Sequence, residues 1–180
     1  MIRKIIISWI AATSLILFST QAFALINFSV GVPLSHTFTG KYNGGDEVKS
    51  DGVSGTFIQV GVPILPGIGM DSYKTKLKDN VDTDVETSIY NLYYLLPIPV
   101  INLTIGVGVG STELKCSDCA ESFDKGPATQ AYASLGFPII PFFDLHLSYR
   151  SVSSKIEYKN GSGEHDFGGN VMGLGIGFNF

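Results

Sequence analysis

The sequence predicts an all-β fold: an eight-stranded antiparallel up-and-down transmembrane β-barrel that follows a cleaved signal peptide. Three observations lead to it, namely the alternation of residues within strands, the alternation of short and long connections, and the placement of charge. The alternation is clearest in residues 166–180, which read DFGGNVMGLGIGFNF. A period of two indicates a strand, because successive side chains point to opposite faces. One face here is bulky and apolar and the other is mostly glycine, which is typical of a transmembrane barrel strand.

The first 24 residues predict a secretory signal peptide. Arg3 and Lys4 form a basic start, an apolar run follows, and the residues from Ala22 to Ala24 have the form of a cleavage site. The apolar run is too short for a comfortable membrane-spanning helix. We therefore expect a signal peptide over 1–24 and a barrel domain over 25–180, the latter being 156 of the 180 residues.

The charge of the mature chain argues against a nucleic-acid partner. Without Arg3 and Lys4, 10 of the 12 basic residues remain against 16 acidic ones, so the net charge is −6. Nucleic-acid binding favours a basic patch instead. The later apolar stretches are repeatedly broken by glycine and proline, so membrane insertion requires a closed barrel, since lipid cannot satisfy an open sheet edge.

Eight strands are predicted between two kinds of connection. The short connections are apolar and rich in proline, and they cover residues 63–66, 97–99 and 138–141. The long connections are charged and cover residues 37–54, 74–87, 111–126 and 153–166. Transmembrane barrels have this asymmetry of short inner turns and longer external loops. The predicted strands are 25–36, 55–62, 67–73, 88–96, 100–110, 127–137, 142–152 and 167–180.

The phase of each strand assigns its side chains to lipid or lumen. In strand 142–152, Phe143, Leu145, Leu147 and Tyr149 alternate with Asp144, His146, Ser148 and Arg150. Strand 100–110 alternates aliphatic residues with Asn102, Thr104 and three glycines. Strand 25–36 alternates Ile26, Phe28, Val30, Val32 and Leu34 with Asn27, Ser29, Gly31, Pro33 and Ser35. We expect the apolar members to face lipid. Strand 88–96 is ambiguous, because Tyr and Leu fall on both of its faces.

Charge is nearly absent from these strands. Of the 26 charged residues that follow residue 24, only Asp71, Asp144 and Arg150 lie within predicted strands, and the long connections hold the rest. A Lys or Arg that faces hydrocarbon at mid-depth costs roughly 2–4 kcal/mol. The alternative is a soluble up-and-down barrel with its apolar face inward, as in lipocalins. A soluble barrel would give no physical reason for charged residues to be so rare in the strands.

These features make the mature chain resemble the small eight-stranded outer-membrane β-barrel families of Gram-negative bacteria. The resemblance implies export through the periplasm, a location in the outer membrane among its lipid and lipopolysaccharide, and insertion by the barrel-assembly machinery. It further implies that the apolar residues ending the chain are a sorting signal: Met172, Leu174, Ile176, Phe178 and Phe180. Adhesins, small channels and lipid-modifying enzymes share this fold, so the resemblance does not choose among them.

The two cysteines, Cys116 and Cys119, lie in the third long connection as Cys-Ser-Asp-Cys. In an oxidising compartment this spacing favours a local disulfide. A thioredoxin-like redox site would need a helix N-terminus, of which the sequence gives no sign. A metal site would need two further ligands, for which His36 and His165 are the candidates. The sequence predicts neither a metal nor a cofactor.

Polar residues on the inner faces predict a lumen network made by Asp71, Asp144, His146, Ser148 and Arg150. Eight strands enclose space only for side chains, and buried charges must pair, so we expect a plugged interior. The other predicted inward members are Asn27, Gln59, Asn91, Asn102, Thr104, Gln130 and Tyr132.

A catalytic alternative rests on His146-x-Ser148 followed by Glu157, which is loosely similar to the His-x-Ser and Glu of lipid A deacylase barrels. This sequence departs from that pattern, since Tyr149 stands where the family has Asn and the strand phase turns His146 and Ser148 away from lipid. No catalytic residue is therefore predicted. The favoured function is a structural or surface-interaction (adhesin-like) role, with the external loops contacting an extracellular ligand. A narrow channel for small or apolar solutes and a lipid-modifying enzyme are the alternatives.

Overall fold

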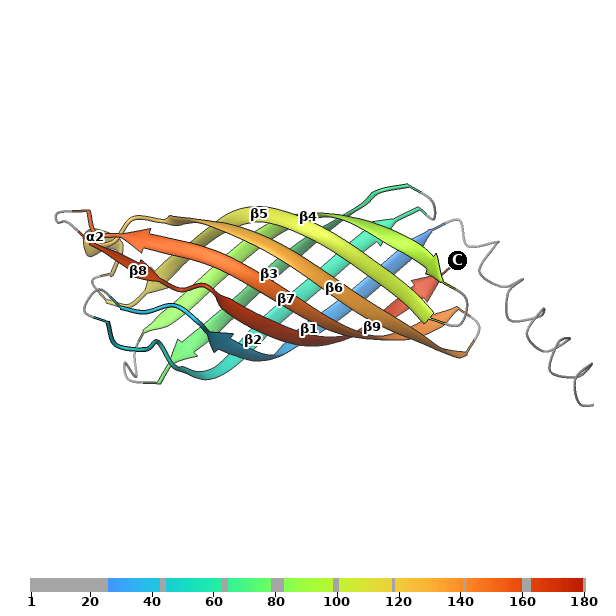
Figure 1. The fold of residues 1–180 in the computed structure, drawn as a ribbon, viewed down its shortest axis with the longest axis horizontal. Helices are drawn as coiled ribbons and strands as arrows, with labels where there is room; N and C mark the ends of the chain where they lie inside the picture. Colours follow the sequence, from blue (N-terminus) through green and yellow to red (C-terminus); the bar gives the residue numbers. More distant parts are fainter. Residues whose placement is uncertain are drawn as a thin grey trace, which may run out of the picture.

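The computed structural model describes residues 26–42, 45–62, 65–78, 83–98, 101–117, 119–140, 142–159 and 163–179, which form a closed β-barrel (Figure 1). The predicted signal peptide and Phe180 lie outside these residues. The strands are β1 (Asn27–Phe38), β2 (Ser50–Gly61), β3 (Gly67–Leu77), β4 (Asp84–Ile98), β5 (Ile101–Lys115), β6 (Gly126–Ile140), β7 (Phe143–Glu157), β8 (Glu164–Asp166) and β9 (Gly169–Asn179). The only helix in the described part of the chain is α2 (Cys119–Ser122).

The barrel is antiparallel and runs up and down. Each strand from β1 to β6 pairs with the next along the chain, and β9 closes the barrel between β7 and β1. The short β8 pairs with β7 and lies beside α2 at one end of the cylinder, whereas the C-terminus lies at the other end (Figure 1). These pairings confirm the predicted fold class of eight antiparallel barrel strands.

No helix of the described residues is long and apolar enough to cross a membrane.

An apolar belt covers the half of the barrel that holds the C-terminus. We call it the lipid-facing belt, and its large exposed members include Ile26, Phe28, Val30, Val32, Leu34, Ile58, Val60, Met70, Tyr90, Leu92, Ile105, Val107, Val109, Leu135, Phe137, Leu145, Leu147, Tyr149, Met172, Leu174 and Ile176. The predicted outward alternation is confirmed in this half. The exposures also assign the two faces of the fourth strand, whose phase was ambiguous in the sequence. Tyr90 and Leu92 face outward, while Asn91 and Tyr93 are buried inside.

A ring of short polar side chains ends the belt on its external side. Thr56 pairs with Ser72, Ser72 with Ser88, and Ser88 with Ser111 across β2 to β5, and Ser151 pairs with Asn170 across β7 and β9. Each of these residues lies on the same strand face as a member of the belt, two residues farther along the strand toward the external end. Hydroxyl and amide groups can hydrogen-bond to lipid head groups, so this ring marks the edge of the hydrocarbon.

The strands continue well beyond this ring, which corrects the predicted long loops. β2 begins at Ser50 rather than 55, β3 ends at Leu77 rather than 73, and β5 ends at Lys115 rather than 110. β4 and β7 are extended likewise, to Asp84 and Glu157. The loops were predicted from charge, but a charged residue on the outer face of a strand in water costs nothing and leaves the backbone ladder intact.

The first strand contains an irregularity that reverses its phase. Its register with β9 shifts between Pro33 and Ser35, as in a β-bulge. The prediction that Ser35 faces the lumen is therefore wrong, because Ser35 is exposed and His36 is buried. An extra residue in one strand makes every later side chain change face.

Glycines on the inner face lie where lumen aromatic rings press against the wall. A Cβ on Gly106 would collide with the ring of Tyr132, and one on Gly173 would lie 2.5 Å from Cε2 of Phe57. A contact that short requires a shift of the ring or the strand. Gly106 of β5 and Gly173 of β9 therefore make room for large side chains inside a narrow barrel.

Candidate functional site

The lumen at the inner end of the barrel is filled by amides around one carboxylate. Asp144 Oδ2 accepts hydrogen bonds from Asn102 Nδ2 at 2.5 Å and from Asn179 Nδ2 at 2.7 Å. Asn27 Nδ2 in turn donates to Asn179 Oδ1 at 2.6 Å. This network joins four strands across the inner mouth and supplies donors to a buried carboxylate, as burial of charge requires.

The middle of the lumen is crossed by an ion pair. Arg150 Nε lies 2.9 Å from Asp71 Oδ2, and the two side chains are 3% and 0% exposed. The guanidinium carbon of Arg150 stacks 3.6 Å from the ring centroid of Phe57 and 5.1 Å from that of Tyr132. A planar guanidinium suits such stacking and ion pairing together. We call Asp71, Arg150, Phe57 and Tyr132 the lumen layer.

Amide side chains complete the lumen layer. Gln130 Nε2 donates to Asp71 Oδ2 at 2.7 Å and to Asn91 Oδ1 at 2.9 Å. Gln59 Nε2 donates to Tyr132 Oη at 2.7 Å. Beside this layer lies a cavity of about 20 Å³, whose lining includes Gln59 and Arg150. A cavity of roughly 10–15 Å³ is the minimum for one water molecule, so this cavity has room for about one water.

The three residues of the catalytic alternative are engaged separately. Ser148 Oγ donates to the carbonyl of Gly173 at 3.2 Å and accepts a hydrogen bond from Arg150. His146 Nδ1 lies 3.5 Å from Ser134 Oγ. Glu157 ends the same strand, nine residues beyond Ser148 and therefore about 30 Å away at 3.3 Å per residue. Both His146 and Ser148 are buried within the lumen.

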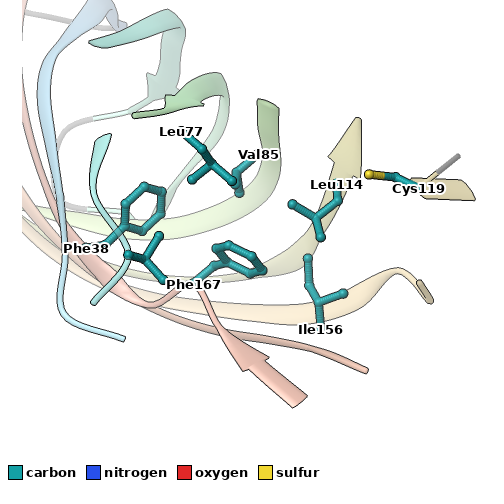
Figure 2. Close-up of a cluster of buried hydrophobic side chains, with 8 residues drawn as sticks. Phe38, Leu77, Val85, Leu114, Cys119, Ile156 and Phe167 are labelled. Carbon is teal, nitrogen blue, oxygen red and sulfur yellow. The ribbon is translucent and has the colours of Figure 1, made fainter. Parts of the chain in front are cut away.

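The external half of the barrel has an apolar interior, which the sequence analysis did not predict. We call the described residues beyond the polar ring (35–42, 45–56, 72–78, 83–88, 111–117, 119–129, 151–159 and 163–170) the crown. Figure 2 shows the side chains of Phe38, Leu77 and Ile156, which come from β1, β3 and β7, pointing into the shared interior of this end of the barrel. The buried cluster is Phe38, Val48, Leu77, Val85, Leu114, Cys119, Ile156 and Phe167. Alternating apolar residues in opposite phase to the belt, such as Val85 and Leu114, are the sequence signal for it.

The outer face of the crown is polar and carries ion pairs between neighbouring strands. Lys74 Nζ on β3 lies 2.8 Å from Glu86 Oε1, its direct cross-strand partner on β4, and 3.6 Å from Asp84 Oδ2. Lys155 on β7 pairs with Glu164 on β8. Exposed pairs of this kind contribute only about 0.2–1 kcal/mol each. Their placement shows that this wall of the barrel faces water.

The two cysteines form a disulfide at the tip of the crown. Cys116 follows β5, and Cys119 opens the four-residue helix α2. This short helix differs from the prediction, since the sequence around the cysteines gives no sign of one. Among the described residues, no three His, Cys, Asp or Glu side chains gather as a metal site would require. Cys119 is buried in the crown cluster, so the disulfide anchors the tip to the apolar interior.

His165 on β8 lies at the centre of an aromatic group in the crown. Its Nε2 lies 2.7 Å from Tyr158 Oη, and its ring centroid is 5.4 Å from that of Tyr42 and 5.6 Å from that of Phe123. Burial lowers the pKa of His165 below its usual value of 6.5, because the charged form loses hydration. The imidazole is therefore neutral near pH 7.

The remaining predicted site residues lie on the last strand. Met172, Leu174 and Ile176 of β9 face outward in the belt, and Phe178 packs against Phe143 with ring centroids 5.0 Å apart. Phe180 lies outside the described residues. The sorting role of this strand stays a prediction.

Comparison with known proteins gives likeness in fold alone. No protein-family model matches the sequence, and no curated protein matches it significantly. Neisserial surface protein A is 12% identical with a TM-score of 0.58, and the alignment covers 86% of this chain and 97% of that one. Outer membrane protein W of E. coli is 12% identical with a TM-score of 0.56, over 87% and 98% of the two chains. Outer membrane protein OprG of Pseudomonas aeruginosa is 11% identical with a TM-score of 0.53, over 87% and 96%.

The fold and the belt together define the class of protein. Eight antiparallel strands close into a barrel, and a continuous apolar surface covers one half of its outer wall. The similar solved structures named above are a surface protein and two outer membrane proteins, and the likeness to them is one of fold. The chain is an eight-stranded β-barrel with the fold of outer-membrane proteins, and its outer wall carries an apolar belt of the kind that faces lipid.

Proposed function

We propose that this barrel has a closed lumen and that its function is surface interaction, with the crown binding a partner outside the cell. The observation that carries the proposal is the lumen layer, in which the Asp71–Arg150 ion pair and two aromatic rings cross the barrel. A protein that cannot pass solute through its centre must act from its surface. A mouth built on continuous strands is a rigid scaffold for such binding.

Energetics support a lumen layer that stays closed. Moving Arg150 aside would leave the carboxylate of Asp71, which is fully buried, without its counter-ion. Breaking a buried ion pair by removing one partner costs about 3–5 kcal/mol. At that cost the open arrangement would be populated in fewer than about one molecule in a hundred, since each 1.4 kcal/mol is a factor of ten.

Planar-bilayer recording of the purified protein tests the closed lumen. We expect no stable conductance steps from the native protein. A porin reconstituted in the same bilayer provides the positive control, because the double variant Asp71→Ala/Arg150→Ala would still keep the apolar cluster of the crown and the amide network at the inner mouth. Large and stable steps from the native protein would refute the closed lumen and favour the narrow-channel alternative.

Vesicle adhesion tests the surface-interaction role. Outer-membrane vesicles that carry the barrel should bind immobilised matrix proteins or cultured epithelial cells more than vesicles without it. Replacing the exposed Lys41, Asp46 and Glu47 with serine changes only the crown tip, because all three lie between β1 and β2. The matched control changes two exposed charges on the crown wall, Asp51→Ser and Lys76→Ser.

The tip variant should lose most of the adhesion and the wall control should keep it. Adhesion that never exceeds that of empty vesicles would contradict the surface-interaction role. The substitution His146→Ala separates the enzyme alternative, since it should leave adhesion unchanged and would matter only to a lipid-modifying activity. Lipopolysaccharide, the barrel-assembly machinery and outer-membrane lipid are the other proposed partners, and each follows from the location of the barrel.

A further inference from the structure

A cavity of about 360 Å³ opens inside the crown, above the apolar cluster. Its lining includes Leu77 and Leu114, which we call the aliphatic floor, and the rings of Phe123, Tyr158, His165 and Phe167, which we call the aromatic wall. Phe123 stacks on Tyr158 with ring centroids 4.7 Å apart, and Tyr158 lies 5.0 Å from His165. These contacts make a continuous aromatic surface from three separate segments of the chain.

The lining of this cavity has the chemistry of a site for a neutral ligand. No Asp, Glu, Lys or Arg is among the residues that line it in the described part of the chain. The polar edges of the wall are turned to each other, since Tyr158 Oη and His165 Nε2 lie 2.7 Å apart. A charged ligand would lose hydration here without meeting an opposite charge among the described lining residues, which is costly. A flat apolar ring would instead pack on aromatic faces, which gains about 0.5–1.5 kcal/mol for each ring pair.

The size of the cavity selects ligands larger than one ring. An engineered apolar cavity of about 150 Å³ accommodates benzene. The crown cavity has more than twice that volume, and it falls within the range of roughly 300–1,000 Å³ that is usual for small-molecule sites. A bicyclic compound fills this space better than a single ring does.

The position of the cavity excludes membrane lipid as its natural occupant. It lies in the crown, whose outer wall carries charged and hydroxyl residues such as Lys74 and Ser111, so acyl chains end below it. Its floor is closed by the buried cluster and, deeper, by the Arg150 layer. A ligand that enters from the medium therefore stops here. Cys116 and Cys119 both border the cavity, and their disulfide holds that side of it in place.

We propose that the crown cavity binds an uncharged bicyclic aromatic molecule from the external medium. The proposal goes beyond the proposed function, because it assigns a small-molecule ligand to a cavity of the external end, independently of whether the lumen is closed. Binding is by stacking on the wall of Phe123, Tyr158 and Phe167, over the aliphatic floor.

The test is isothermal titration of 2-naphthol into the full protein, purified from outer membranes and held in lipid nanodiscs, with empty nanodiscs subtracted. Nanodiscs avoid detergent, whose tails could enter the cavity. Naphthalene-2-carboxylate, which has the same rings and a negative charge, is the matched probe. We expect saturable binding of the naphthol and at least about tenfold weaker binding of the carboxylate, because desolvating the charge is uncompensated.

Two variants locate the site. Thr83 borders the cavity, and Thr83→Phe should fill it and abolish saturable binding without removing any wall residue. Phe123→Ala should weaken binding about two- to tenfold, the range for one lost ring contact. Phe142→Ala, which removes an exposed ring at the opposite end of the barrel, is the control and should bind as the native protein does. Heat-modified gel mobility checks that each variant is folded.

The proposal is overturned if 2-naphthol gives no saturable heat, if folded Thr83→Phe binds it unchanged, or if the carboxylate binds equally well. None of these three results tests whether the barrel conducts ions. Conversely, a conducting native barrel that still binds 2-naphthol would refute the closed lumen and keep the ligand site, so the two failures are distinguishable.

Discussion

The two halves of this barrel have opposite interiors. In the membrane half, β7 turns His146 and Ser148 inward and Leu147 outward, whereas in the crown the same strand turns Ile156 inward and Lys155 outward. The backbone and its two-residue period do not change between them. What changes is the medium outside the wall, from lipid to water. The surroundings therefore decide which face of the wall is apolar. Lipid requires an apolar outer face and leaves polar side chains to the lumen, whereas water accepts a polar outer face and leaves apolar side chains to the interior.

The largest expected effect on stability comes from a substitution at the centre of the membrane half. Arg150→Met leaves the carboxylate of Asp71 buried with Gln130 as its remaining donor, because Gln130 Nε2 still lies 2.7 Å from Asp71 Oδ2. We expect a loss of about 3–5 kcal/mol in the free energy of unfolding. Urea unfolding of the barrel from lipid vesicles measures it.

The double variant Asp71→Leu/Arg150→Met tests whether the loss comes from an uncompensated charge. Replacing both partners by apolar groups is often neutral or stabilising, so most of the stability should return. A double variant that is no more stable than Arg150→Met would mean that the stacking of Arg150 on Phe57 and Tyr132, rather than its pairing, holds the layer.

The crown interior should behave as the core of a soluble protein. Ile156 is fully buried, and Ile156→Ala should cost about 2–5 kcal/mol, because the transfer energy is lost and a cavity remains. Ile105→Ala in the belt removes the same atoms from a side chain that is 46% exposed to lipid. Lipid chains refill that space, so its loss should be smaller. Equal losses in urea unfolding would contradict the contrast between the two halves.

The outer wall gives the converse comparison. Leu147→Lys places a charge against hydrocarbon within the belt and should cost about 2–4 kcal/mol near mid-depth. Ser153→Lys makes the same change on the outer face of the same strand in the crown, where it should be close to neutral. The efficiency of folding into vesicles reports both variants. If Ser153→Lys proved as harmful as Leu147→Lys, the hydrocarbon would extend beyond the polar ring.

The sequence predicted the membrane half better than the crown. In the belt, alternation alone identifies both faces, so Leu147 and His146 were assigned correctly. In the crown, charges such as Lys74 and Glu86 were interpreted as loop, because charge within a strand was taken as incompatible with a barrel wall. The prediction of faces from alternation holds only where the medium outside the strand stays the same. These strands pass from lipid into water, so the apolar face changes from the outside to the inside along their length.

Partners in the lumen could not be predicted either. Asp71 and Arg150 are 79 residues apart in the chain, and only the register of the closed barrel brings them together. The bulge between Pro33 and Ser35 likewise depends on pairing with β9. The cavity in the crown needs β8 and α2, two short elements that no period in the sequence reveals.

The smallest expected effect is a pH dependence confined to the crown. Burial lowers the pKa of His165 in the folded state, so between that pKa and 6.5 the unfolded chain binds the proton more readily. The stability contributed by neutral His165 is complete above pH 6.5 and is lost as the pH falls toward the folded-state pKa. We therefore expect the free energy of unfolding to decrease as the pH falls from about 6.5 to 5.5.

His165→Phe isolates this contribution, because it keeps a ring in the aromatic wall and removes the titrating group. His36 and His146 are present in both proteins, so their effects cancel when the two pH slopes are compared. The native protein should lose more stability than His165→Phe over this range. Parallel slopes would show that the crown is open enough to hydrate a charged imidazole, and the crown interior would then be less like a protein core than its apolar cluster indicates.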